Sequence, residues 1–312
     1  MSVHPVLEIL HARRAQRSEP GARTDGARIA LVVEGGGMRG VVSSAMTQAL
    51  EEAGLTASFD FAVGCSAGAL NAAALLAGVA KGCTVEYAGA FASRRFINPA
   101  RLLLGRPAVD VEYVLDHAGD HLDAARHART LASPIPLHCI ATAVDSAEGE
   151  DLTGFTDLKE LRHALLASSR LPWVGGGPVT FRGRQYLDGG LVEAIPLRSA
   201  LKLGATHVLV LQTRPEGLRY PASEGFAERI VEARLRALNP ALVERYRARG
   251  RAYDEASDEV ALRESERGTG PYVLGVRLPS GTPSVSRLER RAPVLREAAR
   301  VALEHTRQLL GV

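Results

Sequence analysis

The amino-acid sequence predicts an α/β fold of three layers, with helices on both faces of a mainly parallel central sheet and a helical C-terminal extension. Short apolar, often β-branched runs recur without polar alternation, which is typical of strands buried on both faces of a parallel sheet. Glycine-rich turns and helical stretches follow several of these runs. From Arg214 onward the chain is dense in Arg, Glu and Ala with apolar residues three to four apart, which predicts amphipathic helices.

Composition and charge limit the possible partners and compartments. With 312 residues, of which 46% are hydrophobic, the chain can form one sizeable core. The 38 basic and 35 acidic residues nearly balance and aromatic residues make up only 5%, so we expect no nucleic-acid partner. Three cysteines without CxxC spacing argue against a disulfide framework or a zinc site and favour a reducing compartment.

We expect neither a secretory signal nor a membrane-spanning helix in this sequence. The polar, Arg-rich first 26 residues lack the apolar core of a secretory signal. No apolar run approaches the roughly 20 residues of a membrane-spanning helix. We therefore expect a cytoplasmic protein, for which a peripheral encounter with membrane remains open.

An apolar run at residues 28–33 predicts a buried strand, and a glycine-rich loop and a helical stretch follow it. The loop consists of Gly35, Gly36, Gly37, Met38, Arg39 and Gly40. Successive glycines cost backbone entropy, and they make sense where bare backbone must lie against a ligand. N–H groups at a helix N-terminus form an anion or oxyanion cradle. We assign this loop to an oxyanion site, with the N–H groups of Gly36, Gly37 and Met38 as donors.

The same loop also fits the G-x-G-x-x-G pattern, through Gly35, Gly37 and Gly40. A dinucleotide-binding unit would need an acidic residue about 20 positions further on, at the end of the second strand. Asp60 is near that distance, but it lies within the strand that follows and not at its carboxyl end. A nucleotide-binding oxidoreductase is therefore an alternative that ranks below a hydrolase.

The pentapeptide Gly64-Cys65-Ser66-Ala67-Gly68 has the form G-x-S-x-G of a nucleophile elbow. An apolar run at 59–63 predicts a strand before it, and residues 69–76 predict a helix after it, which is the context that this motif needs. A sharp turn projects the serine side chain away from the sheet. Gly64 and Gly68 are small enough to let strand and helix approach closely. Ser66 is therefore the candidate nucleophile, although an ordinary Gly-Ser turn would have the same composition.

A carboxylate stands on a second tight turn, Asp188-Gly189-Gly190, at the end of an apparent strand. An ordinary Asp-Gly hairpin would explain this turn taken by itself. However, functional loops gather at the carboxyl ends of the strands in an open parallel sheet. The three loops can therefore converge, with Ser66 as nucleophile and Asp188 as base.

The position of the histidines favours a base without histidine. An α/β-hydrolase orders its triad as Ser, acid and His, and only His207 and His305 follow Asp188. His207 opens an apolar strand and His305 lies inside the last helical pattern. A carboxylate of ordinary pKa is a poor base for a serine hydroxyl, so we expect a dry pocket that raises the pKa of Asp188. Such a hydrophobic cleft also suits an acyl chain.

Together the three motifs resemble the patatin-like phospholipase family, which includes plant patatins, cytosolic phospholipase A2 catalytic domains and bacterial relatives. Softer matches are residues 167–172 and 194–196, and the resemblance spans about 29–211. It implies a Ser66–Asp188 dyad that cleaves carboxylic esters of phospholipids or related acyl lipids through an acyl-enzyme, with no cofactor or metal. It also implies that Arg39 helps the glycine loop to bind charge.

With this resemblance we expect an N-terminal extension over 1–26, a catalytic domain over 27–213 and a mostly helical region over 214–312 that completes or caps it. A third, non-enzymatic hypothesis is that the C-terminal helices bind an anionic lipid surface. Their nearly balanced Arg and Glu favour a solvated, salt-bridged face instead. Trp173 is a candidate for the acyl pocket or the core. His117 and His121 are four apart, and a solvated helix face explains them better than a metal site.

Overall fold

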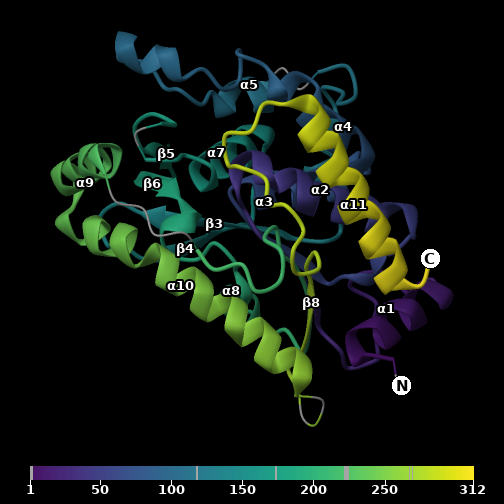
Figure 1. The fold of residues 1–312 in the computed structure, drawn as a ribbon. Helices are drawn as coiled ribbons and strands as arrows, with labels where there is room; N and C mark the ends of the chain where they lie inside the picture. Colours follow the sequence, from purple (N-terminus) through teal and green to yellow (C-terminus); the bar gives the residue numbers. More distant parts are fainter. Residues whose placement is uncertain (1–2, 117–118, 173, 221–224, 267, 269) are drawn as a thin grey trace.

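The computed structural model describes residues 3–116, 119–172, 174–220, 225–266, 268 and 270–312. In this part of the chain eight strands form one sheet, in the order β5-β6-β3-β2-β1-β7-β8 with β4 beside β3, and helices cover both of its faces (Figure 1). The strands are β1 (Ile29–Val33), β2 (Phe61–Cys65), β3 (Leu137–Ala143), β4 (Gly149–Leu152), β5 (Val179–Phe181), β6 (Arg184–Asp188), β7 (His207–Leu211) and β8 (Tyr272–Val276). The predicted fold class is confirmed.

The sheet has a parallel part and an antiparallel edge. Strands β3, β2, β1, β7 and β8 run parallel to one another. Strands β4 and β6 run antiparallel to β3, and β5 runs antiparallel to β6. Because β1 and β2 are parallel neighbours, with Val33 opposite Gly64, the loops that follow them leave the sheet side by side.

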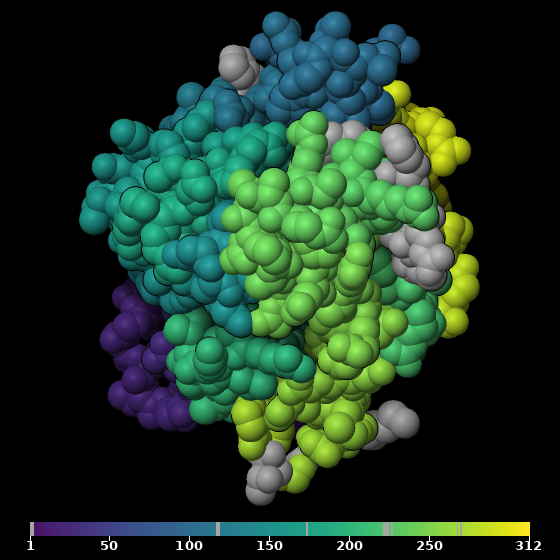
Figure 2. Space-filling view, turned by 90° about the vertical axis from the view of Figure 1, so that its left-hand side faces the viewer, coloured from purple at the N-terminus to yellow at the C-terminus, as the bar shows by residue number. Residues whose placement is uncertain are grey.

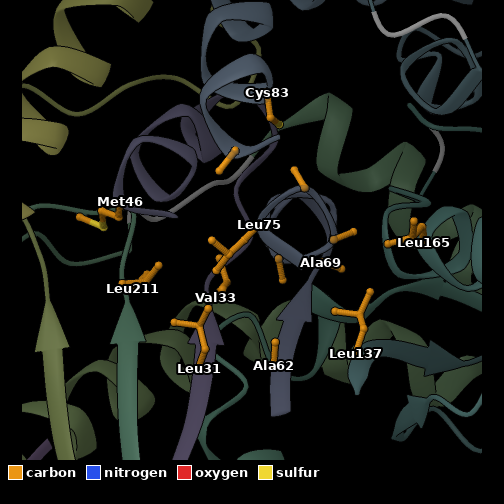
Figure 3. Close-up of a cluster of buried hydrophobic side chains, with 14 of the residues drawn as sticks. Leu31, Val33, Met46, Ala62, Ala69, Leu75, Cys83, Leu137, Leu165 and Leu211 are labelled. Carbon is orange, nitrogen blue, oxygen red and sulfur yellow. The ribbon is translucent and has the colours of Figure 1, made fainter. Parts of the chain in front are cut away.

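Apolar side chains of the strands point alternately to the two helical layers. One layer contains α1 (Pro5–Ala15), α2 (Val41–Glu52), α3 (Ala67–Leu76), α4 (Ala80–Ala88), α7 (Leu158–Ser168) and α11 (Ala292–Leu310). Figure 3 shows Leu31 and Val33 in the buried cluster on this side, together with Leu75 of α3. Ala30 and Val32 enter a second cluster beneath α8 (Leu197–Lys202) and α10 (Pro240–Ser265). Burial on both faces explains why these strands lack polar alternation.

The chain after residue 214 adds a strand as well as helices. Strand β8 pairs with β7, and α10 packs against β8 and against α9 (Phe226–Leu238). Helix α11 packs along α2, where Arg307 forms an ion pair of 2.5 Å with Glu52. Figure 2 shows α9 and α10, in light green, as the middle of one side of the molecule. The amphipathic helices predicted for this part of the chain are thus confirmed, and β8 adds a strand to the sheet.

The start of α7 differs by one residue from what its sequence predicts. Residues 156–168 have the pattern of a helix with Thr156 as its N-cap, whereas Asp157 caps α7 and accepts a hydrogen bond of 2.8 Å from the Glu160 N–H. Asp157 has the extended backbone of an N-cap residue, and a carboxylate there complements the helix dipole. The Thr156 hydroxyl instead donates to the Glu160 carboxylate at 3.1 Å.

Candidate active site

Ser66 lies on a strained turn between β2 and α3. Its φ of 56° and ψ of −129° belong to a region that residues with a side chain rarely adopt. A Cβ on Gly64 would lie 2.5 Å from the Ala69 Cα, and one on Gly68 would lie 2.2 Å from the Val33 carbonyl oxygen. Only glycine fits at either position, so the tight strand-to-helix approach expected from the motif is present.

Ser168 at the end of α7 fixes the backbone of this turn. Its Oγ accepts a hydrogen bond of 2.9 Å from the Ser66 N–H and donates one of 2.7 Å to the Ile140 carbonyl oxygen. Ser168 therefore ties the turn to β3. Sequence reasoning noted it only within the softer match at 167–172 and gave it no role.

The Ser66 hydroxyl donates a hydrogen bond of 2.7 Å to Oδ2 of Asp188. The second carboxylate oxygen, Oδ1, accepts one of 2.8 Å from the Gly190 N–H. Asp188 is 3% exposed and Ser66 is 7% exposed. Burial raises the pKa of the Asp188 carboxyl, while the hydrogen bonds from Ser66 and Gly190 and the charge of Arg287 act in the opposite direction.

Asp188 reaches Ser66 by a different route from the one expected. It ends β6, which is antiparallel to β3, so the argument from carboxyl ends of parallel strands is wrong for this residue. The strand register aligns the two side chains instead, because Cys65 lies opposite Ile140 and Asp188 lies opposite Ala141. Gly189 allows this close pairing, since a Cβ there would lie 2.2 Å from the Ile140 carbonyl oxygen.

The glycine loop places two unused N–H groups beside the serine. Within the described ranges, the N–H groups of Gly36 and Gly37 donate to no protein acceptor. The Met38 N–H donates to the Arg287 carbonyl oxygen at 3.0 Å, which corrects its assignment as an oxyanion donor. The Gly35 N–H donates to the Ala194 carbonyl oxygen at 3.4 Å. Gly36 and Gly37 are therefore the candidate donors.

The glycine loop needs glycines because neighbouring atoms lie too close for a side chain and because Gly37 has a left-handed backbone conformation. Gly37 has a φ of 58°, and a Cβ there would lie 2.7 Å from the Arg287 carbonyl oxygen. A Cβ on Gly35 would lie 2.5 Å from the Cys65 carbonyl oxygen, so the loop and the elbow touch. A Cβ on Gly40 would lie 2.6 Å from the Tyr87 hydroxyl.

Arg39 is buried behind the loop and paired within the protein. Its Nε donates to the Thr213 Oγ1 at 3.0 Å, and its guanidinium lies 3.7 Å from the Glu34 carboxylate. Burial lowers the pKa of Arg39 to about 10, opposed by the negative charge of Glu34. Because Glu34 balances its charge, the most direct role of Arg39 is to brace the loop.

Two cavities meet at Ser66. One is apolar and lies among α3, α4, α5 (Val111–Asp116) and α7. Its walls include Leu70, Phe91, Val111 and Leu165. The other is an open cleft between the glycine loop, Asp188 and the part of the chain that begins at residue 214. Ser66, Gly37 and Leu171 line both.

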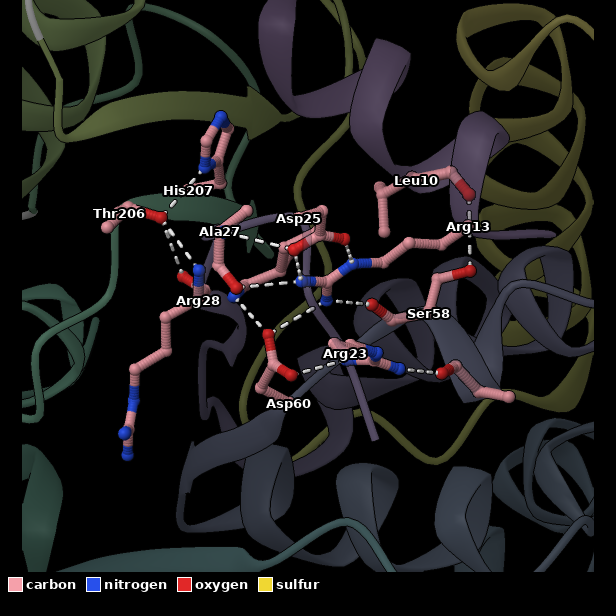
Figure 4. A network of polar contacts seen from close by, with 12 residues as sticks. Leu10, Arg13, Arg23, Asp25, Ala27, Arg28, Ser58, Asp60, Thr206 and His207 are labelled. Carbon is pink, nitrogen blue, oxygen red and sulfur yellow. Dashed lines mark hydrogen bonds and ion pairs between the residues drawn. The ribbon is translucent and has the colours of Figure 1, made fainter. Parts of the chain in front are cut away.

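Asp60, the acidic residue that a dinucleotide site would need, belongs to a separate ion-pair network. It receives hydrogen bonds from Arg13 at 2.8 Å, Arg23 at 2.5 Å and the Ile29 N–H at 2.6 Å (Figure 4). This network lies at the amino ends of β1 and β2, whereas the glycine loop follows the carboxyl end of β1. The geometry therefore does not support a dinucleotide site.

The two histidines that follow Asp188 do not complete a triad in the described structure. His207 lies with the Asp60 network in Figure 4 and bonds to Thr206 at 2.9 Å, and His305 belongs to α11. Neither residue lines either cavity. His117 and Trp173, which the sequence singled out, lie outside the described residues.

A family model described as patatin-like phospholipase matches residues 31–201 of this chain, more than half of its length. The chain belongs to the patatin-like phospholipase family. The predicted resemblance to this family is therefore confirmed.

Individual relatives add little about function. The chain is 30% identical over 199 residues to the uncharacterized protein YjjU of Escherichia coli K12, an alignment that covers 62% of this chain and 54% of YjjU. The chain thus spans about half the length of that relative. VipD from Legionella pneumophila aligns with 94% of this chain and 69% of its own, at 12% identity and a TM-score of 0.41, which is too distant to bear on function.

Replacing Gly35 with alanine is expected to lower esterase activity at least tenfold and to destabilise the fold by about 1–3 kcal/mol. The added methyl group has no room between the loop and the elbow, so one of the two must shift. Ester hydrolysis and the thermal melting temperature would be measured side by side. Gly177→Ala is the matched control, because a Cβ there meets nothing within 4 Å. An active, fully stable Gly35→Ala would contradict the tight contact.

Proposed function

We propose that this patatin-like protein hydrolyses the carboxylic ester bonds of phospholipids or related acyl lipids, with Ser66 as nucleophile and Asp188 as general base. The observation that carries the proposal is the 2.7 Å hydrogen bond from the Ser66 hydroxyl to a buried carboxylate, at the point where an apolar cavity meets an open cleft. A nucleophile, a base and two free N–H donors are the parts that acyl transfer needs.

In the first half of the reaction, Asp188 takes the proton of the Ser66 hydroxyl as Oγ attacks the ester carbonyl carbon. The carbonyl oxygen becomes an oxyanion and accepts hydrogen bonds from the Gly36 and Gly37 N–H groups. The carbon–oxygen bond to the alcohol then breaks, and the alcohol leaves with the proton from Asp188. In the second half, Asp188 takes a proton from a water molecule as the water oxygen attacks the carbonyl carbon of the acyl-enzyme. The bond from that carbon to the Ser66 Oγ then breaks, Oγ receives the proton from Asp188, and the fatty acid leaves.

The two cavities suggest how the substrate lies. An acyl chain fits the apolar cavity, because its Leu, Phe and Val side chains gain by excluding water. The alcohol part of the ester then faces the open cleft. Burial supports the chemistry as well as the binding, since it raises the pKa of Asp188 toward the range in which a carboxylate is a better base.

A chain-length series tests this proposal directly. We expect hydrolysis of p-nitrophenyl acyl esters and of phospholipids, with free fatty acid detected by mass spectrometry, and labelling of Ser66 by a fluorophosphonate probe. Activity that rises with acyl length would reflect the apolar cavity. If no ester in the series is cleaved and Ser66 is not labelled, the proposed function is wrong.

Leu103 and Leu104 offer a surface for contact with the lipid aggregate. They are 89% and 75% exposed at the end of the helical turn η4 (Pro99–Leu104), beside exposed Arg106. This part of the chain, in blue, forms the top of the molecule in Figures 1 and 2. Within the described residues, no helix is long and apolar enough to cross a bilayer. A peripheral contact through this turn is therefore part of the proposal.

Replacing both Leu103 and Leu104 with serine is expected to lower hydrolysis of phospholipid vesicles, relative to that of a monomeric short-chain ester, by about tenfold. The reason is that two leucines would no longer enter the apolar layer of the vesicle. The measurement is the ratio of the two rates, with Leu262→Ser as control because Leu262 is also exposed but lies on α10. An unchanged ratio would remove this turn as the contact.

A further inference from the structure

The open cleft contains a group of arginines and tyrosines that the catalytic steps do not use. Its members are Arg39, Arg214, Arg249, Arg287, Tyr220, Tyr246 and Tyr253. Two of the four arginines have a carboxylate partner, since Arg39 faces Glu34 and Arg249 lies 3.2 Å from Glu228. Within the described residues, the side chains of Arg214 and Arg287 form no ion pair or hydrogen bond.

Arg214 is the more unusual of the two. It follows β7, is 7% exposed, and its Nε is buried without an acceptor in the described structure. The guanidinium lies over the rings of Tyr220, at 4.8 Å, and Tyr253, at 5.1 Å. Ring contacts stabilise a cation but accept none of its N–H hydrogen bonds. A buried guanidinium without an acceptor is costly unless an anion completes it.

Arg287 approaches the catalytic residues from the loop between β8 and α11. Its carbonyl oxygen accepts the Met38 N–H at 3.0 Å, which anchors Arg287 to the glycine loop. Its guanidinium lies 5.2 Å from the centre of the Tyr220 ring, so the guanidinium groups of Arg214 and Arg287 both contact this ring. Arg287 and Asp188 line the same cleft, and the charge of Arg287 opposes the rise in the pKa of the Asp188 carboxyl.

The cations of this cleft repel one another in the structure as it stands. Arg214 and Arg287 both act to lower the pKa of Arg39, in addition to the larger effect of burial. The Glu34 carboxylate lies 3.7 Å from the Arg39 guanidinium and also accepts a hydrogen bond of 2.6 Å from the Thr213 N–H. An anion bound between Arg214 and Arg287 would reduce the repulsion between the two guanidinium groups. It would also accept a hydrogen bond from the Arg214 Nε, which has no acceptor among the described residues.

We infer that Arg214 and Arg287 bind a phosphate group on the alcohol side of the ester, so that the preferred substrates are acyl esters with an anionic, phosphate-bearing head. This inference rests on the proposed function. Phosphate is favoured over carboxylate because its oxygens point in several directions and can accept from two guanidinium groups at once. The cleft also contains Ser66, so a head group there lies opposite an acyl chain in the apolar cavity.

The residues that carry this preference lie outside the part of the chain that matches the family model. That match ends at residue 201, and Arg214, Tyr220, Tyr253 and Arg287 all follow it. The matched part therefore contains the catalytic serine, the carboxylate and the glycine loop. The C-terminal third contains the cleft residues that we infer to bind the head group. Charge selectivity can then vary without a change in the catalytic motifs.

The test compares two esters that differ only in phosphate: a 1-acylglycerol 3-phosphate and the 1-acylglycerol with the same acyl chain, both below their aggregation limits. We expect wild type to prefer the phosphate ester. Arg287→Gln and Arg214→Gln should each lower the ratio of the two kcat/KM values by about 10- to 100-fold. Arg251→Gln is the control, because the side chain of Arg251 is 79% exposed and pairs with Glu255 outside the cleft. An unchanged ratio in both cleft variants would overturn the inference.

Inhibition separates a head-group site from a site for free phosphate. Glycerol 3-phosphate should inhibit p-nitrophenyl butyrate hydrolysis competitively, with a Ki that rises about tenfold in Arg287→Gln. Arg214→Lys, which keeps the charge, should retain more inhibition than Arg214→Gln and also shows whether loss of folding explains the latter. Equal inhibition by inorganic phosphate, together with an unchanged ester ratio, would mean that a free anion occupies the cleft and would overturn the inference.

Binding to an inactive variant keeps the two proposals apart. Glycerol 3-phosphate is expected to bind Ser66→Ala in calorimetry and to bind the double variant Ser66→Ala, Arg287→Gln about tenfold more weakly. If wild type cleaves neither ester, the proposed hydrolysis fails while this binding difference still supports the phosphate site. Equal binding to both variants counts against the phosphate site, whatever the activity.

Discussion

Replacing Ser66 with alanine is expected to lower kcat/KM for acyl-ester hydrolysis by about 10⁴-fold or more. The variant loses the hydroxyl that donates a hydrogen bond of 2.7 Å to the Asp188 carboxylate, at a residue that lines both cavities. The turn itself should persist, because the hydrogen bond to Ser168 comes from the Ser66 backbone N–H. Hydrolysis of p-nitrophenyl esters and fluorophosphonate labelling are the measurements, and the melting temperature reports folding.

Ser146→Ala is the matched control for this prediction, since Ser146 lies in an exposed loop before β4. It should keep wild-type activity and labelling. Cys65 cannot take over the role of Ser66, because its thiol is completely buried and burial raises its pKa well above the ordinary value. Wild-type hydrolysis by Ser66→Ala would therefore leave no nucleophile for the proposed mechanism.

Local sequence predicted those parts of the site in which a loop directly follows a buried strand. The glycine loop after β1 and the elbow after β2 are of this kind, because parallel neighbouring strands bring their carboxyl ends together. Asp188 was found by its Asp-Gly-Gly turn but for a reason that the structure corrects. Strand β6 is antiparallel, and the register across β3 aligns Asp188 with Ser66.

Contacts between distant segments were not predictable in this way. The Ser66 N–H bonds to Ser168, about a hundred residues later, and the Met38 N–H bonds to the Arg287 carbonyl oxygen. No periodicity or spacing encodes either contact, since each depends on how whole elements pack. In the sequence, Arg214 and Arg287 resemble other arginines of a charge-balanced region, and only the fold reveals that they have no acidic partner among the described residues.

Replacing Asp188 with asparagine is expected to lower kcat/KM by about 10³-fold, because the amide cannot take the serine proton. The variant should still fold, since an amide oxygen can accept from the Gly190 N–H and the amide nitrogen can donate to Ser66. Ester hydrolysis across pH is the measurement. In wild type, activity requires ionised Asp188 and should fall as pH decreases through a pKa raised above 3.8. The residual activity of Asp188→Asn should not show this decrease at acidic pH.

The same variant is expected to melt at a higher temperature than wild type at neutral pH. When burial raises the pKa of a carboxyl group, its ionisation costs more free energy in the folded state than in the unfolded chain. The free energy of unfolding of wild type therefore rises as pH falls through the raised pKa. Asparagine carries no charge and avoids this penalty at every pH. The difference in melting temperature should therefore be largest near neutral pH and shrink under acid conditions. The unpaired charge of Arg287 opposes the gain, and a lower melting temperature of Asp188→Asn at neutral pH would mean that the buried carboxylate stabilises the site instead.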